Sequence, residues 1–109
     1  MTDKPDLLKR DKATYKFKSR VELKPTTNIE FVYQDIKTCV SIGLNIDQSM
    51  IDIQELSWRK NSLSDVSIYI GPVHIDKEFV YISKEITESI KEHSMSVDSI
   101  DETACVMTI

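Results

Sequence analysis

The chain of 109 residues has room for one compact domain. Its composition, with 40% hydrophobic and 29% charged residues and a formal net charge of -4, is that of a globular protein and excludes a disordered chain. No apolar run approaches the length of a membrane span, and the first residues lack the apolar core of a secretory signal. We therefore expect a cytoplasmic protein without membrane contact.

Charge is distributed unevenly along the chain. Up to Lys24 there are eight basic residues against four acidic ones, whereas the remainder has six basic and fourteen acidic residues. Residues 1–13 are polar and highly charged, which predicts a flexible tail before a single folded domain of residues 14–109. A basic arm and first strand are therefore expected on an acidic body.

The segment Thr14 to Lys24, TYKFKSRVELK, alternates between apolar and charged residues. One parity holds Tyr15, Phe17, Val21 and Leu23, and the other holds Lys16, Lys18, Arg20, Glu22 and Lys24. A period of two over this length predicts a strand with one buried face. Pro25 and the polar residues after it predict the end of that strand.

The segment that follows Pro25 fits two structures. Thr27 and Glu30 have the spacing of a capping box before apolar residues on one helical face, yet residues 29–33 also alternate as in a strand. From Thr38 to Ile46 the β-branched content and the strict alternation favour extended structure. We expect a short helix or a further strand up to about residue 37, followed by a strand to Ile46.

The rest of the chain has the spacing of a meander before its last helix. Strands are expected over about 51–58 and 66–70, and residues 78–82 form a further short apolar stretch. Ser83 is a suitable N-cap, and Ile86 and Ile90 are four residues apart, which predicts a helix from about Lys84 to His93. After a polar link, the closing TACVMTI predicts a final strand.

These elements predict an α+β fold: an antiparallel β-sheet of about five strands with one or two helices packed on one face. If residues 28–37 are helical, the order is β-α-β-β-α-β, as in the ferredoxin-like arrangement. If they are extended, the fold is mainly a β meander or half-barrel with one C-terminal helix. Neither arrangement identifies a function.

No motif for catalysis, cofactor binding or phosphate binding is present in the sequence. His74 and His93 are the only histidines, neither stands in a nucleophile elbow, and the two glycines leave no loop that could cradle a phosphate. Cys39 and Cys105 lack CxxC spacing, so reduced core thiols are expected rather than metal ligands, although their pairing stays open. We expect a non-enzymatic protein with no cofactor and no metal.

Trp58 is the single tryptophan, and Arg59 follows it in a predicted turn. These residue types dominate binding energy at many interfaces, so an exposed Trp58 would anchor a partner, whereas a buried one would close the core. With the acidic residues nearby they make up the protein-binding candidates, which are Trp58, Arg59, Asp52, Glu55 and Asp65.

The nucleic-acid-binding candidates are Lys16, Lys18 and Arg20, which point the same way along the first strand. Their spacing of roughly 6.5–7 Å, twice the strand rise, is close to that of phosphates along one strand. Tyr15 and Phe17 lie on the opposite face, however, and cannot stack with bases beside these cations. A lysine-rich strand is also a common protection of a sheet edge against pairing with other chains.

These features predict a small protein-binding module, such as an immunity protein or inhibitor of a bacterial or phage system that occludes a basic protein partner. The first alternative is a nucleic-acid-associated accessory protein that uses the basic arm and first strand. The second is a structural subunit of a viral particle or other assembly, in which sheet edges add to neighbouring sheets.

Overall fold

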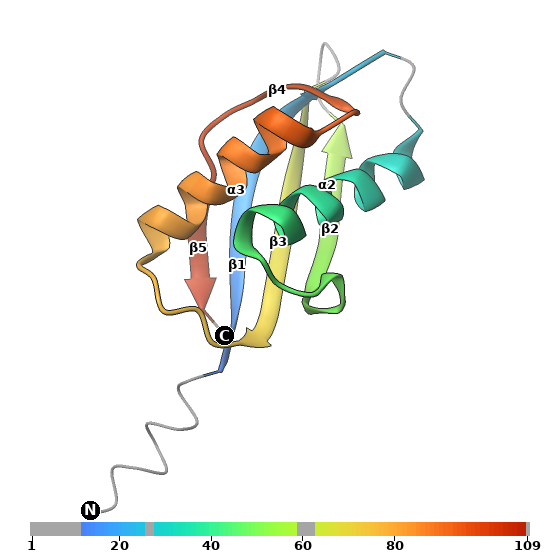
Figure 1. Cartoon of the computed structure of the whole chain (residues 1–109). Helices are drawn as coiled ribbons and strands as arrows, with labels where there is room; N and C mark the ends of the chain where they lie inside the picture. Colours follow the sequence, from blue (N-terminus) through green and yellow to red (C-terminus); the bar gives the residue numbers. More distant parts are fainter. Residues whose placement is uncertain (1–11, 26–27, 59–62, 109) are drawn as a thin grey trace, which may run out of the picture.

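The computed structural model describes residues 12–25, 28–58 and 63–108. Figure 1 shows the elements, which are β1 (Ala13–Leu23), α2 (Ile29–Leu44), the short 3-10 helix η1 (Gln48–Met50), β2 (Ile51–Trp58), β3 (Leu63–Val73), α3 (Phe79–His93), β4 (Val97–Ile100) and β5 (Ala104–Thr108). The predicted tail of residues 1–13 lies almost wholly outside the described residues, and β1 begins at Ala13.

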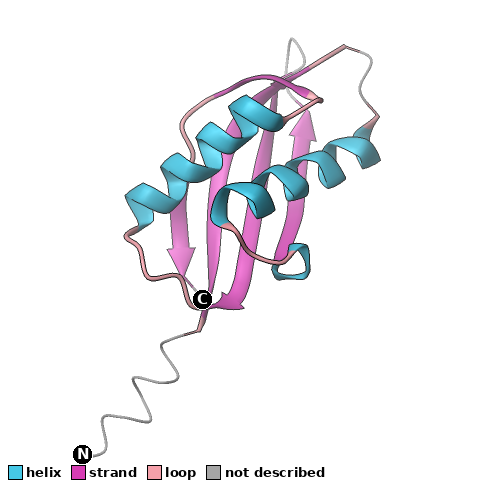
Figure 2. Cartoon of the chain, in the orientation of Figure 1, coloured by secondary structure: helices cyan, strands magenta, loops and turns pink. Residues whose placement is uncertain are grey.

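All strand pairs in the five-stranded sheet are antiparallel, in the order β2-β3-β1-β4, and β5 also pairs with β1. Since β3 pairs along nearly the whole of one side of β1, β4 and β5 must follow one another along its other side. Both helices cover one face of the sheet, and the other face is open (Figure 2). The predicted α+β class is confirmed, with the β-α-β-β-α-β order rather than a half-barrel.

The core lies between the sheet and the two helices. The predicted buried face of β1 is confirmed, since Tyr15, Phe17, Val21 and Leu23 are all buried. They meet apolar side chains of β3 and of both helices: Val66, Ile68, Ile70, Val32, Ile36, Ile82, Ile86 and Ile90. Neither described helix combines the length and the apolar character needed to cross a membrane.

Helix α2 is longer than the sequence predicts. It begins after Asn28, whose Oδ1 accepts a hydrogen bond from the N–H of Glu30 at 2.8 Å, whereas the predicted cap Thr27 lies outside the described residues. It continues to Leu44 and ends at Asn45 in the left-handed conformation. The predicted strand from Thr38 to Ile46 is therefore wrong. Tertiary packing of a helical stripe overrides the β propensity there.

Helix α3 also differs from the prediction at its start. It begins at Phe79 after Glu78, so residues 78–82 are not a strand, and Ser83 is a buried residue inside the helix rather than its N-cap. The buried residues Ile82, Ile86 and Ile90 recur every four positions on one face of α3, a spacing that favours a helix over this whole segment. The link after α3 contains β4, a strand that the polar sequence there did not predict.

A buried carboxylate joins α2 to the segment between α3 and β4. Asp35 is 8% exposed, and its Oδ2 accepts hydrogen bonds from the hydroxyls of Ser94 at 2.5 Å and Ser96 at 2.6 Å. The backbone N–H groups of Met95 and Ser96 donate to the same carboxylate. Lys24 at the end of β1 donates from its N–H to the carbonyl of Ser96, so this cluster also sets the entry into β4.

The two helices approach closely near the end of α2. A Cβ placed on Gly43 would lie 2.7 Å from the Cβ of Ser89, so only glycine fits at this crossing. The Ser89 hydroxyl donates to the carbonyl of Cys39 at 2.5 Å. The helices are therefore fixed to each other as well as to the sheet.

Replacing Asp35 by Asn should lower the free energy of unfolding by roughly 2–3 kcal/mol, because the buried donors around it lose a charged acceptor. Urea unfolding followed by circular dichroism measures the change. The control Asp98→Asn alters an exposed carboxyl on β4 and should change stability by less than about 0.5 kcal/mol. Equal stability of the Asp35→Asn protein and the unchanged chain would contradict the assigned role.

Candidate protein-binding edge

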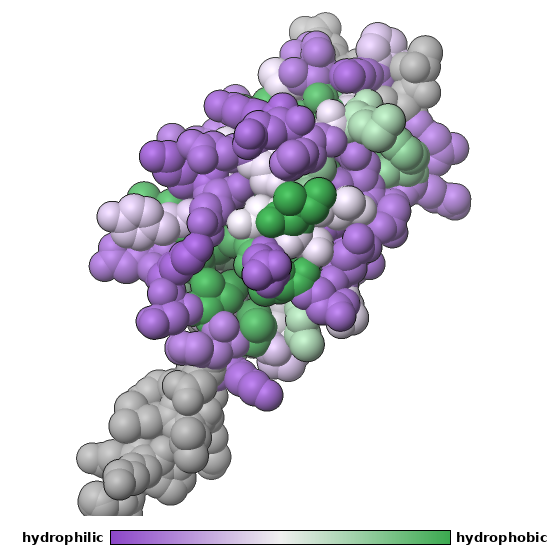
Figure 3. Space-filling view, in the orientation of Figure 1, coloured by the Kyte–Doolittle hydropathy of each residue, from purple (hydrophilic) through white to green (hydrophobic). Residues whose placement is uncertain are grey.

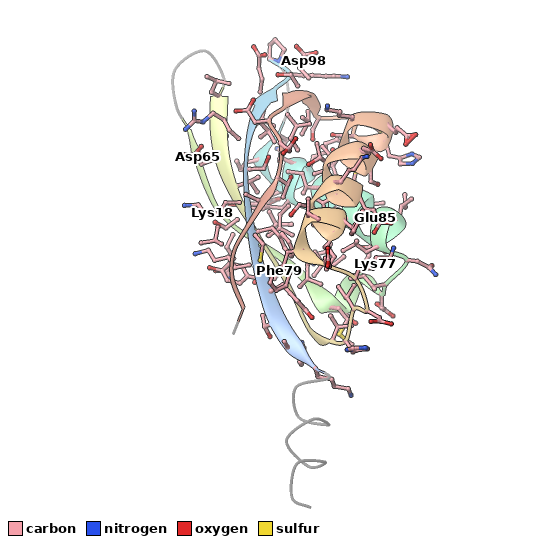
Figure 4. All side chains as sticks on the ribbon, turned by 90° about the vertical axis from the view of Figure 1, so that its left-hand side faces the viewer. Lys18, Asp65, Lys77, Phe79, Glu85 and Asp98 are labelled. Carbon is pink, nitrogen blue, oxygen red and sulfur yellow. The ribbon has the colours of Figure 1, made fainter. Side chains whose placement is uncertain are left out.

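The predicted basic stripe lies on the open face of an internal strand. Lys18 and Asp65 point away from the helices (Figure 4), and Lys18 is exposed. The Nζ of Lys16 lies 5.3 Å from the ring centre of Tyr69, and the Nε of Arg20 lies 3.1 Å from an oxygen of Asp65. The three cations therefore share one face, as predicted, but two of them have partners on β3.

Acidic and aromatic side chains from the neighbouring strands share this face. The pairing register places Tyr69 and Asp65 of β3 and Asp52 of β2 on it, and Glu22 follows the cations on β1. Tyr15 is buried on the other face, as predicted, but Tyr69 supplies an aromatic ring beside the cations that β1 alone could not show. Three carboxylates therefore balance the three cations of the open face.

The interpretation of β1 as a protected edge strand is wrong, because β1 pairs on both sides. The edges of the sheet are β2 on one side and β4 with β5 on the other. No lysine or arginine occurs from Ser94 to Ile109, and β5 has the uncharged sequence ACVMT. The edge formed by β5 therefore lacks protective charges and prolines, but the strand has only five residues and its register with β1 shifts between Cys105 and Met107, and both features limit pairing with another strand.

A groove runs between this edge and α3. It has a volume of about 600 Å³, and its apolar lining comes from Phe79 and Val80 of α3 and from Ala104 and Cys105 of β5. Phe79 is 45% exposed and Val80 is 65% exposed. The Phe79 ring packs edge-on against the Tyr15 ring, with 5.7 Å between the two ring centres. Figure 4 views the molecule from this side. We call this feature the edge groove.

Charged residues of both signs line the edge groove. Glu88 of α3 and Glu102 of the link before β5 line it, together with Lys84 and Lys91. Further acidic residues of the same edge are exposed, namely Asp98 on β4 and Asp101 in the link. On the helical side, hydrophilic side chains dominate, and hydrophobic ones emerge in separate patches at the centre of the face and toward its lower end (Figure 3). The charges of the groove lining are thus balanced, and the excess negative charge of this edge comes from Asp98 and Asp101 outside the groove.

The predicted protein-binding candidates are not part of this groove. Asp52 and Asp65 lie on the open sheet face, where Asp52 accepts a hydrogen bond from Gln54. The backbone of Trp58 pairs with Ser64 at the end of β2. The side chains of Glu55 and Trp58, and all of Arg59, lie outside the described part of the chain. The uncharged closing strand was the sequence signal that could have indicated the groove.

Titratable groups outside the edge form no reactive cluster in the described ranges, where no three His, Cys, Asp or Glu side chains are grouped to hold a metal. Cys39 and Cys105 form no disulfide bond; Cys39 is buried in α2, and Cys105 is half-buried in the groove wall. Burial, and secondarily the negative charge of Asp35, raise the pKa of the Cys39 thiol to about 12. Cys39 is therefore a core residue without nucleophilic character.

No protein-family model, curated protein or solved structure matches this chain. The surfaces described above are therefore the basis for an assignment of function.

Alkylation by iodoacetamide at pH 8 should modify Cys105 in the folded protein and leave Cys39 unmodified. With a pKa of about 12, roughly one Cys39 thiol in ten thousand is ionised at this pH, and burial shields it as well. Peptide mass spectrometry locates the modification, and the same reaction in urea should modify both cysteines. Comparable rates at the two positions in the folded protein would contradict the burial of Cys39.

Proposed function

We propose that the chain is a small non-enzymatic binding protein that associates stoichiometrically with a basic protein partner in the cytoplasm. An immunity protein or inhibitor of a bacterial or phage system acts in this way, by occluding its partner. The observation that supports the proposal best is the edge formed by β4 and β5. Asp98, Asp101 and Glu102 lie on β4 and in the link after it, no lysine or arginine occurs from Ser94 to Ile109, and the uncharged β5 borders the apolar start of α3.

The two components of this edge have different physical roles. The carboxylates attract a basic surface and raise the rate of encounter. The exposed apolar side chains of Phe79 and Val80 exclude water once the partner is in place, which slows dissociation. Gathered apolar surface with a polar rim is typical of protein interfaces, whereas scattered single residues are not.

Affinity capture of the tagged full chain from its native host, followed by calorimetry with the recovered partner, tests this proposal. We expect a basic partner in a one-to-one complex that weakens as salt rises. The triple variant Asp98→Asn, Asp101→Asn, Glu102→Gln should bind at least about tenfold more weakly, a loss of roughly 1.4 kcal/mol.

A matched control removes the same number of charges elsewhere on the surface. The variant Asp52→Asn, Asp76→Asn, Glu92→Gln changes three exposed carboxylates outside the β4 and β5 edge. It should keep most of the affinity. Equal losses in the two triple variants would mean that only net charge matters and would overturn the assignment to this edge.

Binding of single-stranded nucleic acid on the open sheet face is the second candidate function. The observation that favours it is Tyr69, because its ring shares the face with Lys16 and Lys18 and could stack with a base. It ranks second because Asp52, Asp65 and Glu22 balance the cations there.

Fluorescence anisotropy with labelled single-stranded DNA and RNA at low salt tests the second candidate. Salt-sensitive binding that is lost in Lys18→Glu and retained in Lys24→Glu would support it, because Lys24 is an exposed lysine beyond the end of β1. The absence of binding at low salt would reject it.

A further inference from the structure

We draw no further inference here: the strongest candidate, the edge groove between the start of α3 and β5, has lysines and glutamates in balance along its lining, and nothing in the structure shows what covers it.

Discussion

The buried carboxylate of Asp35 is the interaction on which the placement of the sheet edge depends. It accepts hydrogen bonds from the hydroxyls of Ser94 and Ser96 and from the backbone N–H groups of Met95 and Ser96, in the turn after α3. The Ser96 carbonyl in turn accepts a hydrogen bond from the N–H of Lys24 at the end of β1. Because β4 begins one residue later, this cluster determines where the last part of the chain meets β1. Because β4 and β5 pair in succession along the same side of β1, the position of β4 also fixes where β5 and the edge groove lie.

Alternation in the sequence identifies which face of a strand is buried but not the position of the strand within a sheet. The buried face of β1 was predictable for this reason, since Phe17 and Val21 must avoid water. Its internal position was not, because the strands that flank it come from residues 63–73 and 97–108. The sequence could not predict the Tyr69 ring beside the cations for the same reason, because the pairing of β3 with β1 brings it there.

The helix boundaries were missed where local propensity and tertiary packing disagree. The β-branched residues between Thr38 and Ile46 favour a strand, yet Cys39 and Val40 continue the buried stripe of α2. Phe79 and Val80 likewise have strand propensity but form the exposed first turn of α3. The groove is therefore built from the start of α3, whose helical structure was not predicted, and from β5, which was predicted as a strand but without its position in the sheet.

The side of β1 opposite β3 is covered by two short strands, β4 and β5, so this side of the sheet resists local opening less than the side paired with β3. The ladder between β1 and β3 extends from Ala13 to Glu22, whereas β5 is joined to the sheet only between Tyr15 and Lys18. Residues 101–103 separate it from β4, so β5 can detach while β4 stays bound to the end of β1. Such an opening would leave the backbone of β1 from Tyr15 to Lys18 without a strand partner on the side opposite β3.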